Sequence, residues 1–439
     1  MTDWLAGLSR AVITPTTPVW LAGYGSKRVP EGTVHDLWVK VLAVADAGGR
    51  RGVMVTCDHM GVPRPMYERI RDEVGRRCGL EQSQLMLLFS HNHCGPVLRD
   101  DLVDFYPLDE QQRALVGQYS DEVTELMVDA VVRALDDLRP ARLSVGSGVT
   151  RFAVNRRDNP EQQVAARMAR GEPLAGAVDH SVPVMAVRQP DGELRGVVFG
   201  YACHPTTMCF NQWCGDYPGF AQLAVEQHHP GATAMFFTGC GADQNPLPRR
   251  ELSLCRRYGR MLATAVEETL LQPMADITGE LHTALRRVDL PFDGVVSASS
   301  LSQHLESGNA IRVRWARRWL DVLSHEPQTT LATSCPYPVA VWQLGAHLIV
   351  ALGGEAVVDY ALRLKRLYGP QTWVAGYANT LVAYIPSDRI YREGGYEGPD
   401  TVYEFGHAAE RWAQGLESRI VDAVMEMVDR IRGTACGGG

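Results

Sequence analysis

Residues 85–96 read LMLLFSHNHCGP, an apolar run that ends in two histidines one residue apart and then in Gly95 and Pro96. An apolar run closed by Gly and Pro predicts a buried strand that leaves the core at this point. Because side chains alternate along a strand, extended geometry would place His91 and His93 on the same side of the chain. Such a pair suits a metal site or an acid/base site, but a lone His-x-His also fits polar residues that simply end a strand.

Around this stretch, short apolar runs alternate with longer amphipathic segments. Apolar spacing and closing Gly or Pro residues predict helices near 66–79, 118–138, 251–271, 299–325, 355–367 and 405–432. Strands are expected near 39–47, 52–58, 85–91, 233–241, 280–290, 338–345, 347–352 and 372–378, and the turn PDGE at 190–193 predicts a hairpin. This alternation favours an α/β fold with layered β-sheets flanked by helices.

The length of 439 residues allows two or three domains, but no repeat, low-complexity block or long linker divides the chain. The strands expected after residue 280 need partners to become buried. We therefore expect a single catalytic domain over residues 1–432, with sub-regions of about 1–275 and 276–432, and a flexible tail over 433–439.

The composition is that of an ordinary soluble protein, with 45% hydrophobic and 21% charged residues. The net charge of -8 offers no basic surface for nucleic acid, so no nucleic-acid partner is expected. The N-terminal stretch lacks the pattern of a secretory signal, and no apolar run approaches the roughly 20 residues that span a bilayer. We expect a cytoplasmic protein without stable membrane insertion, acting on a small molecule; a homo-oligomer is compatible with the sequence.

Ligand-type residues recur directly after six of the expected strands. They are Asp58 and His59, His91 and His93, His204, Asp243 and Asn245, Glu355, and Asn379 with Tyr384. Ligand sites in layered α/β proteins form where strand ends converge, so this recurrence predicts an active site there. Singly, each residue also has a structural explanation, such as a strand cap for His204, a helix start for Glu355, a turn for Asp243 or a core position for Tyr384.

Eight stretches, taken in order, carry a family resemblance over most of the chain. They are GLSRAVITP, SHNHCGP, VNRRDNP, ACHPTT, GDYPGFA, FTGCGADQNP, LGGEAVVDY and AYIPSDRIYREGGYEG. In these stretches the chain resembles the neutral ceramidase family, zinc-dependent amidases that cleave the N-acyl bond of ceramide. The resemblance covers the catalytic domain only.

The resemblance implies one zinc ion per chain, held by His91, His204, Glu355 and Tyr384. It also implies catalytic roles for His93 beside the metal and for Tyr384 and Tyr396 at the reacting centre. Two imidazoles and a carboxylate leave a zinc ion open for water, and such a site lowers the pKa of the bound water to about 7. His93 or Tyr396 could then protonate the departing amine.

The resemblance places Arg156 near the polar head of the substrate, and we expect Asp243 and Asn245 to contact the substrate as well. The segment GADQNP departs from the Gly-Asp-x-Ser-Pro turn of the eukaryotic and secreted bacterial ceramidases. Asn245 stands at the serine position, and because an amide side chain is no nucleophile, a covalent serine mechanism is excluded there. Activation of water by a metal is unaffected.

The chain ends in a helix and a short GTACGGG tail, where those ceramidases continue into an immunoglobulin-like domain. We therefore expect a zinc-dependent amidohydrolase whose substrate is smaller or more soluble than ceramide. Two alternatives remain open, since a fold does not determine a reaction. One is a zinc-dependent hydrolase of esters, lactones or glycosides, and the other is a non-catalytic protein that binds a metal or ligand.

Overall fold

The computed structural model describes residues 4–326 and 328–436, and its largest element is a sheet of nine strands. The strands are β1 Trp4–Val12, β2 Trp38–Asp46, β3 Arg51–Cys57, β4 Leu85–Phe89, β5 Arg139–Val149, β7 Ser181–Arg188, β8 Leu194–Tyr201, β9 Thr233–Thr238 and β11 Ala275–Ile277. Their order is β4-β3-β2-β1-β5-β7-β8-β9, with β11 paired to β5. The pairs β3–β4 and β8–β9 are parallel, so each directs two carboxyl ends toward the same edge.

A second sheet lies in the later part of the chain, with the order β12-β13-β14-β16. Its strands are β12 Leu281–Pro291, β13 Ser334–Leu344, β14 His347–Leu352 and β16 Trp373–Ala375. Two short pairs accompany it, namely β6 Ala153–Asn155 with β10 Gln244–Pro246, and β15 Glu355–Ala356 with β17 Tyr384–Ile385. The second pair is parallel and places Glu355 opposite Tyr384.

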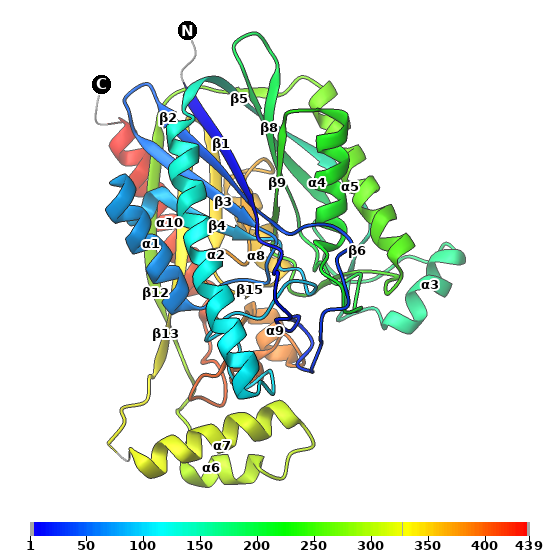
Figure 1. The fold of residues 1–439 in the computed structure, drawn as a ribbon, viewed down its shortest axis with the longest axis vertical. Coiled ribbons are helices and arrows are strands. Elements are labelled where there is room, and N and C mark those ends of the chain that lie inside the picture. Colours follow the sequence, from blue (N-terminus) through cyan, green and yellow to red (C-terminus); the bar gives the residue numbers. More distant parts are fainter. Residues whose placement is uncertain (1–3, 327, 437–439) are drawn as a thin grey trace.

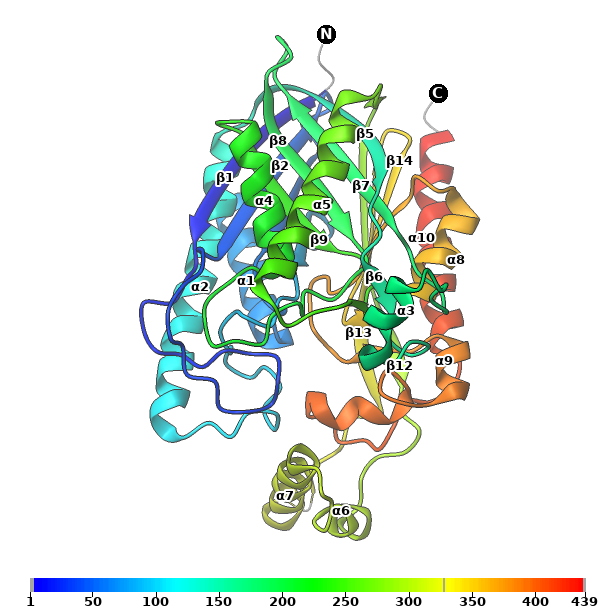
Figure 2. The ribbon, with the colours of Figure 1, turned by 90° about the vertical axis from the view of Figure 1, so that its right-hand side faces the viewer.

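Ten helices of the described part accompany the sheets, and six of them cover the outer faces of the two sheets (Figures 1 and 2). The ten helices are α1 Arg64–Cys78, α2 Glu110–Asp136, α3 Glu161–Ala169, α4 Asp216–His228, α5 Leu252–Leu271, α6 Ala298–His304, α7 Ala310–His325, α8 Val358–Tyr368, α9 Asp388–Glu393 and α10 Leu416–Cys436, with 3-10 turns η1 Gln82–Gln84 and η2 Pro399–Phe405. Helices α1, α2, α4 and α5 pack on the first sheet, and α8 and α10 pack on the second. A third core lies between the two sheets. The expected α/β fold with layered sheets and flanking helices is confirmed.

Strand β2 shows why the sheet strands read as continuous apolar runs. Val39, Val41 and Ala43 face the helices, whereas Leu42 and Val44 face the second sheet. Because both faces of the strand are buried, neither set of alternating positions can be polar without a partner. The same burial explains why the apolar runs predicted these strands correctly.

Several boundaries differ from the sequence expectations, and capping by a side chain explains two of them. The helix expected from 118 begins at Glu110, because the Asp109 side chain accepts a hydrogen bond from the backbone N–H of Gln112. The helix expected over 299–325 is split into α6 and α7, since Asn309 caps a new helix start. In place of one helix over 405–432, η2 ends at Phe405 and α10 begins only at Leu416.

Three strands of the first sheet, β1, β5 and the three-residue β11, were not predicted, and β1 and β5 have a mixed composition. Strand β1 contains Ser9 and Arg10, and the Ser9 hydroxyl donates to the Ala130 carbonyl of α2 at 2.5 Å.

Helix α10 extends to Cys436, so residues 433–436 are helical where a flexible tail was expected, and residues 437–439 lie outside the described part. The chain passes from the first sheet to the second between Ile277 and Leu281, while its behaviour as one domain stays a prediction.

Helices α6 and α7 form an insertion between β12 and β13 that projects from one end of the molecule (Figures 1 and 2). Arg318 of α7 contacts both Asp104 and the Gly406 carbonyl, and so it joins the loop after β4 to the segment after η2. Among the described residues, no helix combines the length and apolarity that a membrane crossing requires.

Candidate active site

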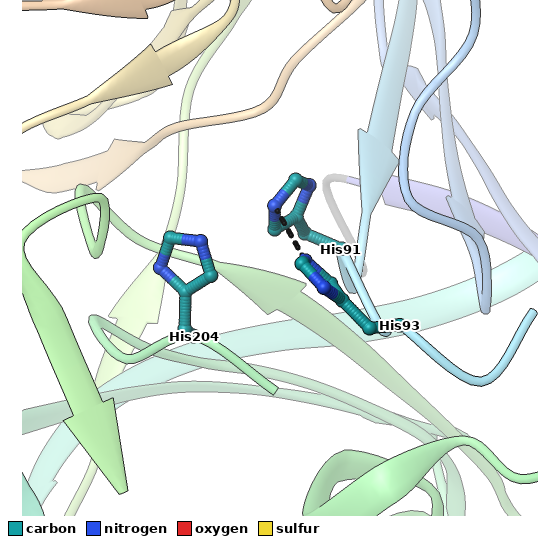
Figure 3. Close-up of side chains that lie close together, drawn as sticks. All are labelled: His91, His93 and His204. Carbon is teal, nitrogen blue, oxygen red and sulfur yellow. Dashed lines mark hydrogen bonds between the residues drawn. The ribbon is translucent and has the colours of Figure 1, made fainter. Parts of the chain in front are cut away.

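Three imidazoles meet just beyond the carboxyl ends of β4 and β8. His91 and His93 follow β4, His204 follows β8, and one ring nitrogen from each lies within 4.8 Å of the others. Figure 3 shows the three rings turned toward a common space, with His91 Nε2 and His93 Nε2 3.3 Å apart. The two parallel strand pairs of the first sheet therefore deliver the histidines to one point, as the strand-end pattern predicted.

Backbone carbonyls orient two of these rings. His91 Nδ1 lies 2.7 Å from the Met60 carbonyl, and His204 Nδ1 lies 2.8 Å from the Gly241 carbonyl. Because a carbonyl only accepts hydrogen bonds, both Nδ1 atoms carry a proton, and in the neutral ring this tautomer leaves the lone pair on Nε2. This arrangement is the one that metal-binding histidines adopt in proteins.

The Glu355 carboxylate enters the same space from β15. Its Oε2 atom lies 3.3 Å from His91 Nε2 and 3.1 Å from His204 Nε2, and all three side chains are buried. Burial alone would raise the pKa of Glu355, but the neighbouring imidazoles of His91 and His204 hold it well below its usual value. The structure therefore brings together a buried carboxylate and two nitrogen donors from separate sheets.

This donor set fits a metal cation. Burial, and next the charge of Arg156, lower the pKa of His204 to about 4, so its Nε2 atom is unprotonated at neutral pH. His204 Nε2 and Glu355 Oε2 then face each other with lone pairs, and among the described residues neither atom has a hydrogen-bond partner. A divalent cation between them would satisfy both atoms at once.

His93 lies beside these donors and is less buried than His91. Burial, together with the charges of His91 and His204, holds its pKa well below the usual value, so the ring is neutral at pH 7. The Gly23 backbone approaches this ring so closely that a Cβ atom there would lie 2.4 Å from His93 Cγ. Gly23, with a φ of 104°, thus confines the imidazole against the site.

Tyr384 and Tyr396 lie together at the outer side of the site. Their ring centroids are 5.1 Å apart, and Tyr384 is buried whereas Tyr396 is 51% exposed. Burial, and next the charge of Glu355, raise the pKa of Tyr384 well above its usual value. The register of β15 and β17 places Tyr384 beside Glu355, while its ligation of a metal stays a prediction.

Arg156 connects these tyrosines to Asn245. Its guanidinium donates to the Tyr384 hydroxyl at 3.3 Å and to Asn245 Oδ1 at 3.4 Å, and it lies 5.3 Å from the Tyr396 ring centroid. Glu397, which the sequence analysis missed, accepts from Arg156 Nε at 2.6 Å. Its position directly after Tyr396 was the signal that could have found it.

The Asp243 side chain is held by groups of the protein. It is fully buried, and its two oxygens accept from the backbone N–H of Val358 and from Asn155 Nδ2. Its backbone carbonyl also accepts from the N–H of Arg156 at 2.9 Å. Asp243 therefore positions Arg156 through the backbone, while its own contact with substrate stays a prediction.

Two other strand-end residues serve the fold. Asp58 accepts hydrogen bonds from the backbone of Trp38 and from Gln222. Asn379 exchanges two hydrogen bonds with the backbone of Leu87 in β4, through its own N–H and its Oδ1 atom. Asn379 thereby ties the second region to the strand that carries His91.

Comparisons with known proteins give the family of the chain and a similar fold. A family model described as "Neutral/alkaline non-lysosomal ceramidase, N-terminal" matches residues 4–242, more than half of the chain. The crystal structure of neutral ceramidase from Pseudomonas aeruginosa superimposes with a TM-score of 0.73 at 18% identity, over 98% of this chain and 74% of that one. A ceramidase complexed with C2 gives the same TM-score and identity, over 98% of this chain and 76% of that one. A search of curated proteins finds no match.

Proposed function

The chain belongs to the neutral/alkaline non-lysosomal ceramidase family, and on that premise we propose that it is a zinc-dependent amidohydrolase that cleaves an N-acyl bond with metal-activated water. The observation that carries this proposal is the convergence of the Nε2 atoms of His91 and His204 on the buried Glu355 carboxylate, at 3.1 to 3.3 Å. Family membership supports hydrolysis of an amide bond. The choice of zinc, one ion per chain, is our inference.

Nitrogen and oxygen donors that lie close together suit zinc. We propose that His91, His204, Glu355 and Tyr384 hold the ion. Bound there, zinc would lower the pKa of a coordinated water to about 7 and would polarise the amide carbonyl. Because burial and the charge of Glu355 raise the pKa of Tyr384, its phenol keeps its proton in the metal-free site. Ligation through the phenol oxygen would therefore need the positive charge of the ion to favour loss of that proton.

The remaining side chains supply the proton transfer and the orientation that amide cleavage needs. Tyr396 is the half-exposed group, and we propose that its hydroxyl donates to the carbonyl oxygen of a bound amide. His93 is neutral, so it can take a proton from water and pass it to the departing nitrogen. Arg156, fixed by Glu397, orients the polar part of the substrate.

We further propose a substrate that is smaller or more soluble than ceramide. Support comes from charged groups near the reacting tyrosines, since Arg156 is paired with the buried Glu397, and burial, together with the charge of the buried Glu404, raises the pKa of Tyr396. An alkyl chain forms no hydrogen bonds with such groups, and its binding would displace their water at a cost in free energy. A compact polar amide retains their hydrogen bonds.

Metal analysis combined with a substrate panel tests the proposal. The purified protein should contain about one zinc per chain by mass spectrometry, and His91→Ala and His204→Ala should each abolish both metal and turnover. Amides and esters that share one acyl group should then be compared at equal concentration. Full activity in either histidine variant would reject the zinc site, and exclusive turnover of esters, lactones or glycosides would reject amidase chemistry.

Three further expectations can be tested separately. Turnover that requires the metal would exclude a non-catalytic binding protein. An intracellular location stays a prediction, which fractionation of cells that express the native gene would check. Self-association is likewise open and would be read from the mass in solution by light scattering.

A further inference from the structure

Tyr377 lies behind the cluster of donors, in the segment that follows β16. It is fully buried, and its ring stacks on the His91 imidazole with centroids 4.1 Å apart and an interplanar angle of 29°. The same ring meets His204 edge-on, at 5.8 Å and 90°. One aromatic side chain thus contacts both imidazoles whose Nε2 atoms face Glu355.

The hydroxyl of Tyr377 adds a polar contact to this packing. Its oxygen lies 3.3 Å from His204 Nδ1, the atom that already donates to the Gly241 carbonyl at 2.8 Å. The phenol oxygen can therefore act as a second, weaker acceptor for the same N–H. Two acceptors at Nδ1 secure the tautomer in which Nε2 keeps its lone pair.

The backbone holds Tyr377 in this place at a conformational cost. Its φ of 53° is in the left-handed region, which is unusual for a bulky residue and persists only where the surroundings determine it. The Tyr377 N–H donates to the carbonyl of Gly354 at 2.8 Å, and Gly354 directly precedes Glu355. The neighbouring Gly376 N–H donates to Thr238 at the end of β9. Tyr377 therefore links the backbone beside the carboxylate to both imidazoles.

We propose that Tyr377 is a positioning residue that organises the metal site without being a ligand. Its ring keeps His91 and His204 in the orientations that direct Nε2 to one point. An imidazole that shares its lone pair with a cation becomes electron-poor, and the electron-rich face of a phenol stabilises such a ring. The tyrosine thus favours the metal-bound site over the metal-free one. The inference rests on the part of the proposed function that assigns a metal to this site.

Metal affinity measured without reference to catalysis tests this role. Protein stripped with a chelator would be titrated with zinc against a chromophoric competitor, and separately with cobalt(II) to record its absorption spectrum. Tyr377→Phe keeps the ring and should change zinc affinity less than about threefold. Tyr377→Leu removes the aromatic face and should weaken zinc binding about tenfold to hundredfold and alter the cobalt spectrum.

A matched control separates positioning from general damage to the core. Tyr337 is equally buried in the core of the second sheet, away from the imidazoles, so Tyr337→Leu should lower the melting temperature while leaving zinc affinity and the cobalt spectrum unchanged. If Tyr377→Leu does not fold, Tyr377→Met keeps more volume without an aromatic face and carries the same expectation. Zinc affinity within twofold of native in the variant that folds, with an unchanged cobalt spectrum, overturns the inference.

Failure of this inference can be told apart from failure of the proposed function. If the native protein binds zinc tightly but hydrolyses no amide, amidase chemistry fails while the effect of Tyr377→Leu on affinity still upholds the positioning role. If the native protein binds neither zinc nor cobalt, both are overturned. If the native protein binds zinc and hydrolyses amides, and the Tyr377 variants bind zinc as tightly as the native protein, the proposed function stands and the positioning role is rejected.

Discussion

The two regions of the chain supply different chemistry to one site. The first sheet contributes nitrogen through His91, His93 and His204, whereas the second region contributes oxygen through Glu355 and Tyr384. Each set stands on its own hydrophobic core, and a third core holds the sheets together. Neither region alone presents the mixed nitrogen and oxygen donors that a catalytic zinc site uses. The packing of one sheet on the other therefore creates the site.

The electrostatics of the two regions are also interdependent. Burial lowers the pKa of His204 to about 4, which leaves a neutral donor. Glu355 is buried as well, yet its pKa is held down by the imidazoles across the interface. Burial within its own region is the main cause that keeps His204 neutral, whereas the charge state of Glu355 depends on the groups that the other region places opposite it.

Replacement of the oxygen donor should produce the largest effect. Glu355→Gln keeps the size of the side chain and removes its charge, so we expect zinc affinity to fall more than about hundredfold and amide turnover to fall at least as far. Metal content after gel filtration and hydrolysis rates would measure the two effects. The exposed Glu393→Gln is the control, and stoichiometric zinc in the Glu355 variant would contradict the assignment.

Removal of the metal should loosen the connection between the regions. A ligand present at a thousandfold excess over its dissociation constant stabilises the folded state by about 4 kcal/mol. We therefore expect chelation to lower the free energy of unfolding by about this amount, measured by denaturant titration with and without zinc. His204→Ala should show no response to zinc, and an equal response in that variant would place the metal elsewhere.

The buried Asp101 offers a pH test of the same interface. Burial, and next the charge of Glu355, raise its pKa from 3.8 to about 7. A carboxyl group whose pKa is raised in the folded state contributes to the free energy of unfolding. The contribution is complete below the pKa of the unfolded chain and is lost as the pH rises through the folded-state pKa of about 7. In metal-free protein, the stability of Asp101→Asn relative to native should therefore increase between pH 4 and pH 7 by up to about 4 kcal/mol, and then level off. Denaturant titrations across this range would measure it.

A second variant measures how much of the pKa shift of Asp101 is caused by the charge of Glu355 in the other region. In the Glu355→Gln background the charge that faces Asp101 is gone, so the gain from Asp101→Asn should be smaller and should begin to level off at lower pH. An identical pH profile in both backgrounds would show that burial alone sets the pKa of Asp101. The coupling between the two carboxyl groups would then be rejected.

The smallest expected effect concerns the geometry of Arg156. Arg156→Lys keeps the charge but loses the planar fork that reaches Glu397, Asn245 and the Tyr384 hydroxyl. We expect kcat/KM to fall about tenfold to hundredfold with metal content unchanged. Arg157→Lys is the matched control, because Arg157 shares Glu397 but contacts neither Asn245 nor Tyr384. Equal losses in both variants would indicate damage to the Glu397 cluster rather than to substrate orientation.

Local sequence predicted most of the first sheet and the donors that follow its strands. Strands such as β2 and β4 are buried on both faces, so their apolar runs stand out in the sequence. Strand β1 was not predicted because its polar side chains find partners that are distant in sequence, with Ser9 bonded to α2 and Arg10 to Glu226 of α4. The break between α6 and α7 was missed because it depends on capping by Asn309 rather than on apolar spacing.

The residues missed at the site are those whose function depends on neighbours from other elements. Tyr377 reads as an ordinary aromatic residue in AGYANT, and only the packing of His91 against its ring gives it a role. The place of Asp243 after a strand predicts a substrate contact, which stays a prediction. The sequence could not show that its carboxylate also accepts from Asn155 and Val358, which are far away along the chain.

The sequence by itself determined the layered α/β class, the strand ends and the residue types that can bind a metal, because burial and backbone period act over a few neighbouring residues. Only the tertiary structure decided which of these residues share a site. The lone pairs of His204 and Glu355 meet because two sheets with separate cores pack face to face. That contact joins residues about 150 positions apart, and no local pattern records it.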